Sequence, residues 1–333
     1  MRAIFLCEKT DKIFRVYNAD VISELQKLTN IGKKIYTKAD VLADPTAFSE
    51  VELIFSTWGM PQLTEDEIKA CFPSLKCVFY GAGTVQKFAR PFLNCGVKVF
   101  SAWAANAVPV AEMTVAQIIL ANKGYFLTNR LYHAKGVAAS KEAFNKCRGN
   151  YGETVGIIGA GMIGKLVIEM LKNYNLKVLV FDPFLPDEKA AELGARKCEL
   201  EELFENAFVV SNHLANNPQT VGMLNYGLFS KMRENAVFIN TGRGAQVVEE
   251  DLVRILSERP DLTALLDVTY PEPPVDDHPF YTLPNCLLTP HIAGSAGDEV
   301  ARMGEYMLGE CTSYLNGEVG KYEVSMKMLE TMA

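Results

Sequence analysis

An apolar run that closes on three nearby glycines constrains the fold of this 333-residue chain more than any other feature. Residues 154–158 are typical of a buried parallel strand, and residues 165–173 carry apolar side chains at helical spacing. Gly159, Gly161 and Gly164 lie between these two segments. The pattern predicts a tight turn that joins a strand to a helix.

Each glycine of this turn has a mechanical role if a dinucleotide binds there. The first permits the tight turn, the second lets the backbone approach a pyrophosphate, and the third lets the helix pack closely on the strand. The start of the helix also offers free N–H groups to phosphates. The next predicted strand, residues 177–181, ends at Asp182, whose carboxylate can accept from both ribose hydroxyls. We therefore interpret the segment as a dinucleotide-binding turn rather than an ordinary strand–helix connection.

Strand-like and helix-like segments alternate on both sides of this turn, which predicts two parallel sheets covered by helices. In the first part we expect strands at 2–7, 34–36, 53–56, 77–80 and 97–101, and helices at 20–28, 65–72 and 86–94. In the second part we expect strands at 154–158, 177–181, 208–211, 236–240, 262–268 and 286–289, and helices near 165–173, 199–204, 226–231, 250–258 and 297–315. Between the two parts we expect an apolar helix over 108–123, with Pro109 in its first turn, and an extended arm over 125–150.

The composition argues against several classes of protein. The chain has 40 acidic and 33 basic residues and a formal charge of −7, which disfavours binding to nucleic acids and anionic membranes. We expect no apolar run as long as a membrane span. The eight cysteines form no CxxC pair and lie mostly in apolar runs. This is typical of reduced thiols, so we predict a cytoplasmic protein without a metal site.

Three polar residues of the second part each follow a predicted strand, at the edge where open parallel sheets bind ligands. They are Arg243, Glu272 and His291. Taken singly, the arginine could be an ion-pair partner, the glutamate a solvated loop acid and the histidine a satisfied polar residue. Together, in one dinucleotide-binding domain, they favour a set that combines acid–base chemistry with anion binding.

These segments resemble the signatures of the D-isomer-specific 2-hydroxyacid dehydrogenase family, which includes D-lactate, glyoxylate/hydroxypyruvate and phosphoglycerate dehydrogenases. The order along the chain is the same as in the family. The matching segments are the turn at 159–164, Asn240-Thr241-x-Arg243-Gly244, Thr289-Pro290-His291-x-Ala293-Gly294, Ser211-x-His213-Leu214, Asp267-Val268-x-x-x-Glu272-Pro273, Gly81-Ala82-Gly83 and the stretch that begins at Asn106.

The resemblance implies an α/β fold with two doubly wound parallel-sheet domains and a cleft between them. A flavodoxin-like substrate domain would comprise residues 1–107 plus 291–333, and a Rossmann NAD-binding domain would comprise residues 108–290. The implied cofactor is NAD, and the implied substrate is a small 2-keto or D-2-hydroxy acid. The 125–150 arm would be the contact of a homodimer.

The resemblance also implies catalytic roles. Arg243 would hold the substrate carboxylate and polarise the reacting carbonyl. His291 would be the general acid in reduction and the base in oxidation, with Glu272 bonded to its far nitrogen. A carboxylate in that place favours the protonated imidazolium.

Further positions would bind the substrate or the cofactor. The backbone amides of Ala82 and Gly83, with Asn106, would hold the carboxylate of the substrate. Asp182 would accept from the ribose and Asp267 from the nicotinamide carboxamide. The complete set of implied cofactor contacts is Gly159, Gly161, Met162, Ile163, Gly164, Asp182, His213, Thr241, Gly242, Asp267 and Ala293.

The chain departs from the family pattern near these sites. Ala215 stands where proline usually follows the pair at 213–214, and Gly242 stands where alanine is common. Gln246 replaces an apolar residue, and Val248 replaces an acidic or amide residue. Thr84 follows Gly83 where an acidic residue is frequent. These departures leave the identity of the substrate open but not the class of reaction.

Three alternatives are weighed against this interpretation. 3-Phosphoglycerate dehydrogenation would call for cations around a phosphate, whereas the expected mouth offers aromatic residues such as Trp58 and Trp103. Formate oxidation is disfavoured because that branch of the family pairs its histidine with glutamine, and this chain has Glu272. A non-catalytic NAD(H)-sensing protein of the same fold would retain the arginine, glutamate and histidine, but this chain has neither a basic surface bias nor a long disordered tail.

Overall fold

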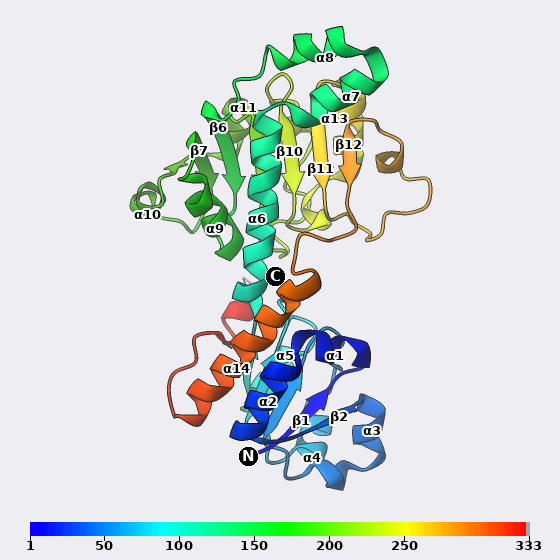
Figure 1. Ribbon diagram of the computed structural model, residues 1–333, viewed down its shortest axis with the longest axis vertical. Helices are drawn as coiled ribbons and strands as arrows, with labels where there is room; N and C mark the ends of the chain where they lie inside the picture. Colours follow the sequence, from blue (N-terminus) through cyan, green and yellow to red (C-terminus); the bar gives the residue numbers. More distant parts are fainter. Residues whose placement is uncertain (331–333) are drawn as a thin grey trace. The chain divides into compact units, whose positions relative to one another are not determined.

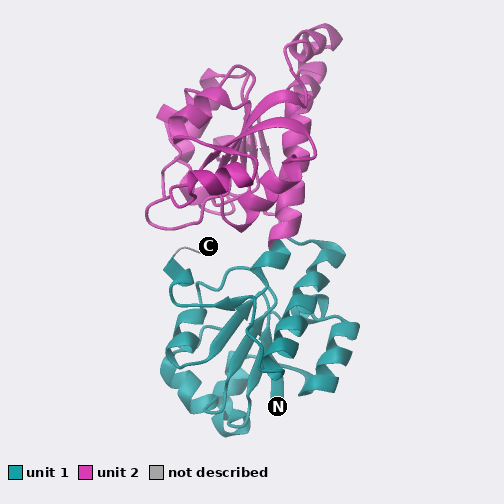
Figure 2. Cartoon of the chain, turned by 90° about the vertical axis from the view of Figure 1, so that its left-hand side faces the viewer, with its two compact units in different colours: residues 1–106, 295–333 teal, residues 107–294 magenta. Residues whose placement is uncertain are grey.

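The computed structural model describes residues 1–330, and the chain divides into two compact units (Figure 2). Unit 1 contains Met1–Asn106 and the C-terminal segment from Ser295, and unit 2 is Ala107–Gly294. The chain therefore returns to unit 1 four residues later than the expected boundary at 290–291. The physical reason is that the N–H groups of Ile292 and Ala293 donate to Asp267, at 2.8 and 2.9 Å, and keep this segment on unit 2.

Unit 1 is built on a six-stranded sheet with the order β13-β5-β4-β3-β1-β2. Its parallel strands are β1 (Arg2–Leu6), β2 (Asn30–Tyr36), β3 (Leu53–Ser56), β4 (Cys77–Tyr80) and β5 (Lys98–Ser101). The order 2-1-3-4-5 is flavodoxin-like, as expected. The short strand β13 (Glu323–Val324) pairs antiparallel with β5, so the sheet is mixed rather than wholly parallel.

Helices cover both faces of this sheet. Successive residues of β1 point to opposite faces, so its apolar side chains contribute to two core clusters, one on each face. Ile4 and Leu6 belong to one core cluster, and Ala3 and Phe5 belong to the other. The first cluster is covered by α3 (Lys38–Ala43), η1 (Pro45–Phe48), α4 (Glu65–Cys71) and α5 (Ala89–Asn94). The second is covered by α1 (Thr10–Val16), α2 (Ala19–Leu28), and α14 (Ala301–Leu315), which follows the short turn η4 (Gly297–Val300).

Unit 2 is a fully parallel, seven-stranded sheet with the order β12-β11-β10-β9-β6-β7-β8. Its strands are β6 (Tyr151–Ile158), β7 (Asn175–Phe181), β8 (Arg196–Lys197), β9 (Val209–Asn212), β10 (Val237–Asn240), β11 (Thr263–Leu266) and β12 (Cys286–Leu288). The chain first builds outward from β6 through β7 to β8, and then returns to β9 on the other side of β6. The gap between the ends of β6 and β9 is therefore the topological switch point, where doubly wound sheets bind their ligands.

Both faces of this second sheet are also covered. One face packs against α6 (Trp103–Asn122), α9 (Met162–Leu171) and α10 (Asp187–Glu192). The other packs against α11 (Leu200–Asn206), α12 (Tyr226–Phe229) and α13 (Glu249–Glu258). The prediction of two doubly wound α/β units is confirmed.

The long apolar helix α6 differs from its prediction in two ways. It begins at Trp103 rather than 108, so Pro109 lies inside the helix and not in its first turn. At 20 residues and a mean hydropathy of 1.4, it is also long and apolar enough to cross a membrane, contrary to the expectation that no such run exists. Its side chains at Ala111, Val115 and Ile118 are buried in the core of unit 2, which accounts for its apolar composition.

The 125–150 arm is helical and not extended. It forms two helices, α7 (Tyr125–Lys135) and α8 (Val137–Phe144), which pack against each other across Gly136 (Figure 1). Ser140 Oγ donates to the carbonyl of Thr128 at 2.9 Å and joins the two. The sequence pattern missed these helices because neither buries a full apolar stripe, and periodicity is the signal that predicts a helix.

Candidate active site

The glycine turn lies at the switch point, and its geometry explains each glycine separately. Gly159 has φ +89°, and a Cβ there would stand 2.8 Å from the carbonyl oxygen of His213. A Cβ on Gly164 would overlap the carbonyl oxygen of Gly159. By contrast, a Cβ on Gly161 would meet no atom within 4 Å. The protein itself requires the first and third glycines, whereas the second faces open space.

The open space in front of Gly161 lies at the start of a helix. Helix α9 begins at Met162, so the N–H groups of its first turn, including that of Ile163, have no partner within the helix and lie beside this space. Such N–H groups, together with the positive end of the helix dipole, are the usual ligands of a pyrophosphate. Gly159, Gly161 and Gly164 are therefore positioned as the NAD-binding turn requires.

Asp182 ties the end of β7 to the glycine turn. Its Oδ2 accepts from the N–H of Ala160 at 2.7 Å, and its Oδ1 accepts from the N–H of Phe184 at 2.8 Å. A carboxylate has about four acceptor positions, so both oxygens can still accept from ribose hydroxyls. The next two residues are Pro183 and Phe184, so neither of them is a cation that could neutralise an added phosphate.

His291 and Glu272 are in direct contact beyond the ends of β12 and β11. Nδ1 of His291 lies 2.6 Å from Oε1 of Glu272, which leaves Nε2 as the ring nitrogen available to a substrate. His291 has φ +54°, an uncommon conformation for a residue other than glycine. Backbone conformations of this kind gather at functional sites, where the surrounding structure holds them in place.

Asp267 provides that hold. Its carboxylate is buried, with 3% exposure, and accepts three hydrogen bonds from the segment around the histidine. The donors are Thr289 Oγ1 at 2.6 Å, the N–H of Ile292 and the N–H of Ala293. The N–H of His291 itself donates to the carbonyl oxygen of Asp267 at 3.0 Å. Asp267 therefore anchors the loop that carries His291, and its role toward the nicotinamide stays a prediction.

Arg243 follows β10 at the same edge of the sheet. Burial lowers the pKa of its guanidinium from the ordinary value, and the negative charge of Glu272 opposes that change. Its Nη1 donates to the carbonyl oxygen of Gly242 at 2.7 Å. Because Glu272 contacts His291 and also acts on Arg243, the structure brings all three predicted residues to one region of unit 2.

The predicted carboxylate-binding residues of unit 1 are only partly as expected. The N–H of Ala82 is not free, because it donates to the carbonyl oxygen of Tyr80 at 2.9 Å. A Cβ on Gly83 would lie 3.8 Å from Nδ2 of Asn106, so these two residues are neighbours. Oδ1 of Asn106 accepts from the N–H of Ser295 at 3.0 Å.

Ser295 was not among the sequence candidates. Its Oγ is buried and has no hydrogen-bond partner among residues 1–330. Ser295 follows the family motif directly, but only its contact with Asn106 marks it as part of the site. Gly83, Asn106 and Ser295 are thus neighbours in unit 1, and their contact with a substrate stays a prediction.

Two predicted cofactor contacts are buried in unit 2. Nε2 of His213 lies 2.9 Å from Ser211 Oγ, and burial lowers the pKa of His213 to about 3, so its ring is neutral. Oγ1 of Thr241 lies 3.2 Å from Oγ1 of Thr114 on α6. The side chains of His213 and Thr241 are thus buried near the strand ends, and their contact with the cofactor stays a prediction.

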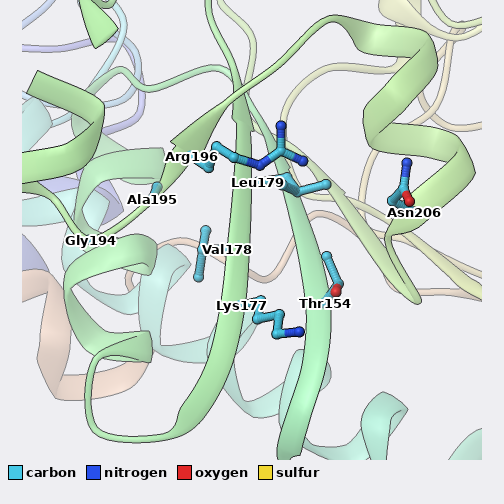
Figure 3. Close-up of a pocket in the computed structure, with 8 residues that line it drawn as sticks. All are labelled: Thr154, Lys177, Val178, Leu179, Gly194, Ala195, Arg196 and Asn206. Atoms are coloured by element: carbon cyan, nitrogen blue, oxygen red, sulfur yellow. The ribbon is translucent and has the colours of Figure 1, made fainter. Parts of the chain in front are cut away.

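A separate hollow of about 460 Å³ lies against the first halves of β6 and β7 (Figure 3). Its lining contains two cations, Lys177 and Arg196, and Arg196 is paired with Glu202 at 2.7 Å. None of the predicted site residues lines this hollow, and its lining has no acid–base pair. We therefore place the active site at the strand ends and not here.

Comparisons with known proteins show the family of this chain. The family model "D-isomer specific 2-hydroxyacid dehydrogenase, NAD binding domain" matches residues 115–293. The putative 2-hydroxyacid dehydrogenase YoaD of Bacillus subtilis is 30% identical over 285 residues, which cover 84% of this chain and 76% of that protein.

Two solved structures share the fold. The apo form of D-mandelate dehydrogenase from Rhodotorula graminis has a TM-score of 0.79 at 18% identity, over 97% of both chains. The NAD-complexed D-isomer specific 2-hydroxyacid dehydrogenase from Lactobacillus delbrueckii ssp. bulgaricus has a TM-score of 0.76 at 19% identity, over 98% of this chain and 100% of that one. With its NAD-binding unit matched throughout by the family's model, this chain belongs to the D-isomer-specific 2-hydroxyacid dehydrogenases, which are NAD-dependent oxidoreductases that act on a CH–OH group.

Proposed function

We propose that the protein reduces a small 2-keto acid to the D-2-hydroxy acid with NADH and catalyses the reverse oxidation with the same residues. The observation that carries this proposal is the 2.6 Å contact between His291 and Glu272, in the region that also holds Arg243. A proton donor beside a fixed cation is what hydride transfer to a carbonyl group requires.

When bound, the nicotinamide supplies the hydride. The protein stabilises the negative charge that develops on the carbonyl oxygen and donates the proton. As the carbonyl carbon gains hydride, its oxygen gains negative charge, which the guanidinium of Arg243 stabilises because it stays protonated near neutral pH. Nε2 of His291 gives its proton to this oxygen and completes the hydroxyl group. The carboxylate of Glu272 stabilises the protonated ring beforehand through Nδ1. In oxidation the same Nε2 takes the proton back.

We assign unit 1 as the substrate domain, whose polar groups would hold the substrate carboxylate. Asn106 Nδ2, the Gly83 N–H and the Ser295 hydroxyl are all neutral donors. Neutral donors suit a carboxylate better than a doubly charged phosphate, which usually recruits arginine or lysine.

Replacing His291 by Asn should lower turnover by on the order of 10²–10⁴ because the general acid is lost. The affinity for NADH should change little. Turnover is measured as steady-state NADH oxidation with a panel of keto acids: glyoxylate, hydroxypyruvate, pyruvate, phenylpyruvate, 2-ketoisocaproate and phosphohydroxypyruvate. The affinity for NADH is measured by fluorescence titration. Near-normal turnover in the variant would overturn the assignment. A wild-type protein that binds NADH but reduces none of these acids would be a sensor rather than an enzyme.

Replacing Glu272 by Gln should alter the dependence of reduction on pH. The amide removes the negative charge that lies 2.6 Å from Nδ1 of His291, the proposed proton donor. Profiles of kcat against pH for the wild type and the variant measure the change. An unaltered profile would remove Glu272 from the mechanism.

The enzyme should prefer NADH to NADPH by on the order of 10² in kcat/KM, because a 2′-phosphate would stand against the Asp182 carboxylate. The variant Asp182→Asn should have a smaller preference for NADH over NADPH in kcat/KM, since the amide removes the negative charge but retains an acceptor oxygen. Equal efficiency with both cofactors in the wild type would show that Asp182 does not contact the ribose.

We also propose that the protein is a cytoplasmic homodimer joined through α7 and α8. Tyr132, Val137 and Phe144 on this helical pair are about half exposed, at 56%, 53% and 48%. Light scattering should give twice the chain mass of 36.9 kDa. The double variant Tyr132→Glu/Val137→Lys should give a monomer, whereas Val319→Lys, at an exposed site in unit 1, should not. A wild-type mass near 37 kDa at micromolar concentration would contradict the proposal.

A further inference from the structure

Three side-chain amides form a buried cluster between the ends of β9 and β10. They belong to Asn212, Asn240 and Gln246, whose exposures are 0%, 1% and 0%. Nδ2 of Asn212 donates to Oδ1 of Asn240 at 3.0 Å and to Oε1 of Gln246 at 2.6 Å. Buried polar groups destabilise a protein unless they are hydrogen-bonded, so the partners of this cluster indicate what it holds in place.

Gln246 uses its whole hydrogen-bonding capacity, which is two donor hydrogens and two acceptor positions. Its Nε2 donates to the carbonyl oxygens of Leu214 and Ala215, at 2.8 and 2.9 Å. Its Oε1 accepts from Asn212 and from the N–H of Arg243 at 3.2 Å. One side chain therefore links the loop that follows β9 to the backbone of the arginine that follows β10.

The backbone of Arg243 is held on both sides by this cluster. Its N–H donates to Gln246, and its carbonyl oxygen accepts from Nδ2 of Asn240 at 3.2 Å. Oδ1 of Asn240 also accepts from the N–H of Gly242 at 3.1 Å. Because the preceding peptide is fixed as well, the Cα of Arg243 has a defined position from which the guanidinium extends.

Gly242 leaves the space that the cluster occupies. A Cβ at this position would lie 3.0 Å from Nδ2 of Asn212 and 3.1 Å from Oε1 of Gln246. Both distances are tighter than ordinary carbon contacts, so an alanine would press on both amides. Gly242 and Gln246 each depart from the family pattern in the sequence. In the structure these two residues are direct neighbours.

We propose that Gln246, with Asn212 as its partner, is a positioning residue that sets the place of Arg243 for binding the substrate. The proposal rests on the role assigned to Arg243 in the proposed function. An apolar residue at 246 could fill the same volume, but it would release the N–H of Arg243 and the two carbonyl groups of the neighbouring loop. A displacement of about 1 Å in such a group can cost on the order of 10²-fold in rate.

The test is Gln246→Met, which preserves approximate volume and removes all four hydrogen bonds. We expect kcat/KM for the best keto acid of the panel to fall by about 10- to 100-fold. The Kd for NADH, measured by fluorescence titration, should stay within about threefold because the glycine turn is untouched. If NADH binding weakens as much as kcat/KM, Gln246 acts on the loop after β9 rather than on Arg243, and the proposal is wrong.

A matched control separates positioning from general stability. Asn285 is another buried amide of unit 2, and its Nδ2 donates to the carbonyl oxygens of Leu256 and Arg259, at 2.9 and 3.4 Å. Asn285→Leu should lower Tm by an amount similar to that of Gln246→Met but leave kcat/KM within about twofold of the wild type. An equal loss of kcat/KM in both variants would attribute the effect to destabilisation and overturn the proposal.

The double variant Asn212→Leu/Gln246→Met also tests whether the loss in kcat/KM is separate from the loss of stability. Replacing Asn212 as well removes the amide that Gln246→Met leaves without one of its acceptors, but the N–H of Leu214 then loses its bond to Oδ1 of Asn212, so Tm should recover only part of its loss. The loss in kcat/KM should persist, because the N–H of Arg243 still lacks its acceptor. If both Tm and kcat/KM recover in the double variant, the cluster contributes only to packing and the proposal is wrong. If the single variant does not fold, this double variant carries the test.

Arg243→Gln distinguishes failure of this proposal from failure of the proposed function. If Arg243→Gln leaves kcat/KM unchanged, Arg243 does not bind the substrate, and the proposed function itself is at fault. If Arg243→Gln lowers kcat/KM strongly while Gln246→Met leaves it unchanged, only the positioning role fails. We expect both variants to lower kcat/KM, with the larger effect in Arg243→Gln.

Discussion

The carboxylate of Asp267, almost wholly buried at the end of β11, holds the segment that carries His291, the proposed general acid and base. A buried charge destabilises a protein strongly unless several donors surround it. Here Thr289 Oγ1 and two backbone N–H groups supply them, all from the segment that contains His291. Because these bonds restrict the backbone on both sides of the histidine, its ring keeps its contact with Glu272.

The same edge of the sheet uses neutral groups to hold the arginine. Asn240 and Gln246 bind the two backbone polar groups of Arg243, and neither carries a charge. A second buried carboxylate in this place would compete with the substrate carboxylate for the guanidinium. Amides hold the backbone without that competition, so the positive charge of Arg243 stays available to an anion.

The topology explains why these groups meet. Strands β9, β10, β11 and β12 are parallel neighbours, so the loops that follow them emerge at one edge of the sheet. The glycine turn after β6 emerges at the same edge, on the other side of β9. Gly159 lies so close to the backbone of His213 that no side chain fits between them. The arrangement of strands thus brings the turn and the catalytic loops of unit 2 to a common side.

Local signals in the sequence were sufficient for much of this structure. Residues 53–56 and 77–80 are strands with the predicted bounds, because a short apolar run between turn residues is unambiguous. Helix α4 also begins with a capping box of Thr64 and Glu67, a feature that depends only on residues three apart. The glycine turn and the loop residues Arg243, Glu272 and His291 were predicted for the same reason: each follows a recognisable strand.

Only the tertiary structure decided what depends on contacts between distant segments. Helices α7 and α8 have weak periodicity and are joined by a contact such as that between Ser140 and Thr128. The N–H of Ala82 is taken by Tyr80, and Ser295 enters the site through Asn106, which is 189 residues away in the chain. The pairing of Asn212 with Gln246 likewise joins two strand ends 34 residues apart. Sequence patterns report the residue types and their spacing along one segment, whereas the hydrogen-bond partner of a buried amide is chosen by the packing of the whole sheet.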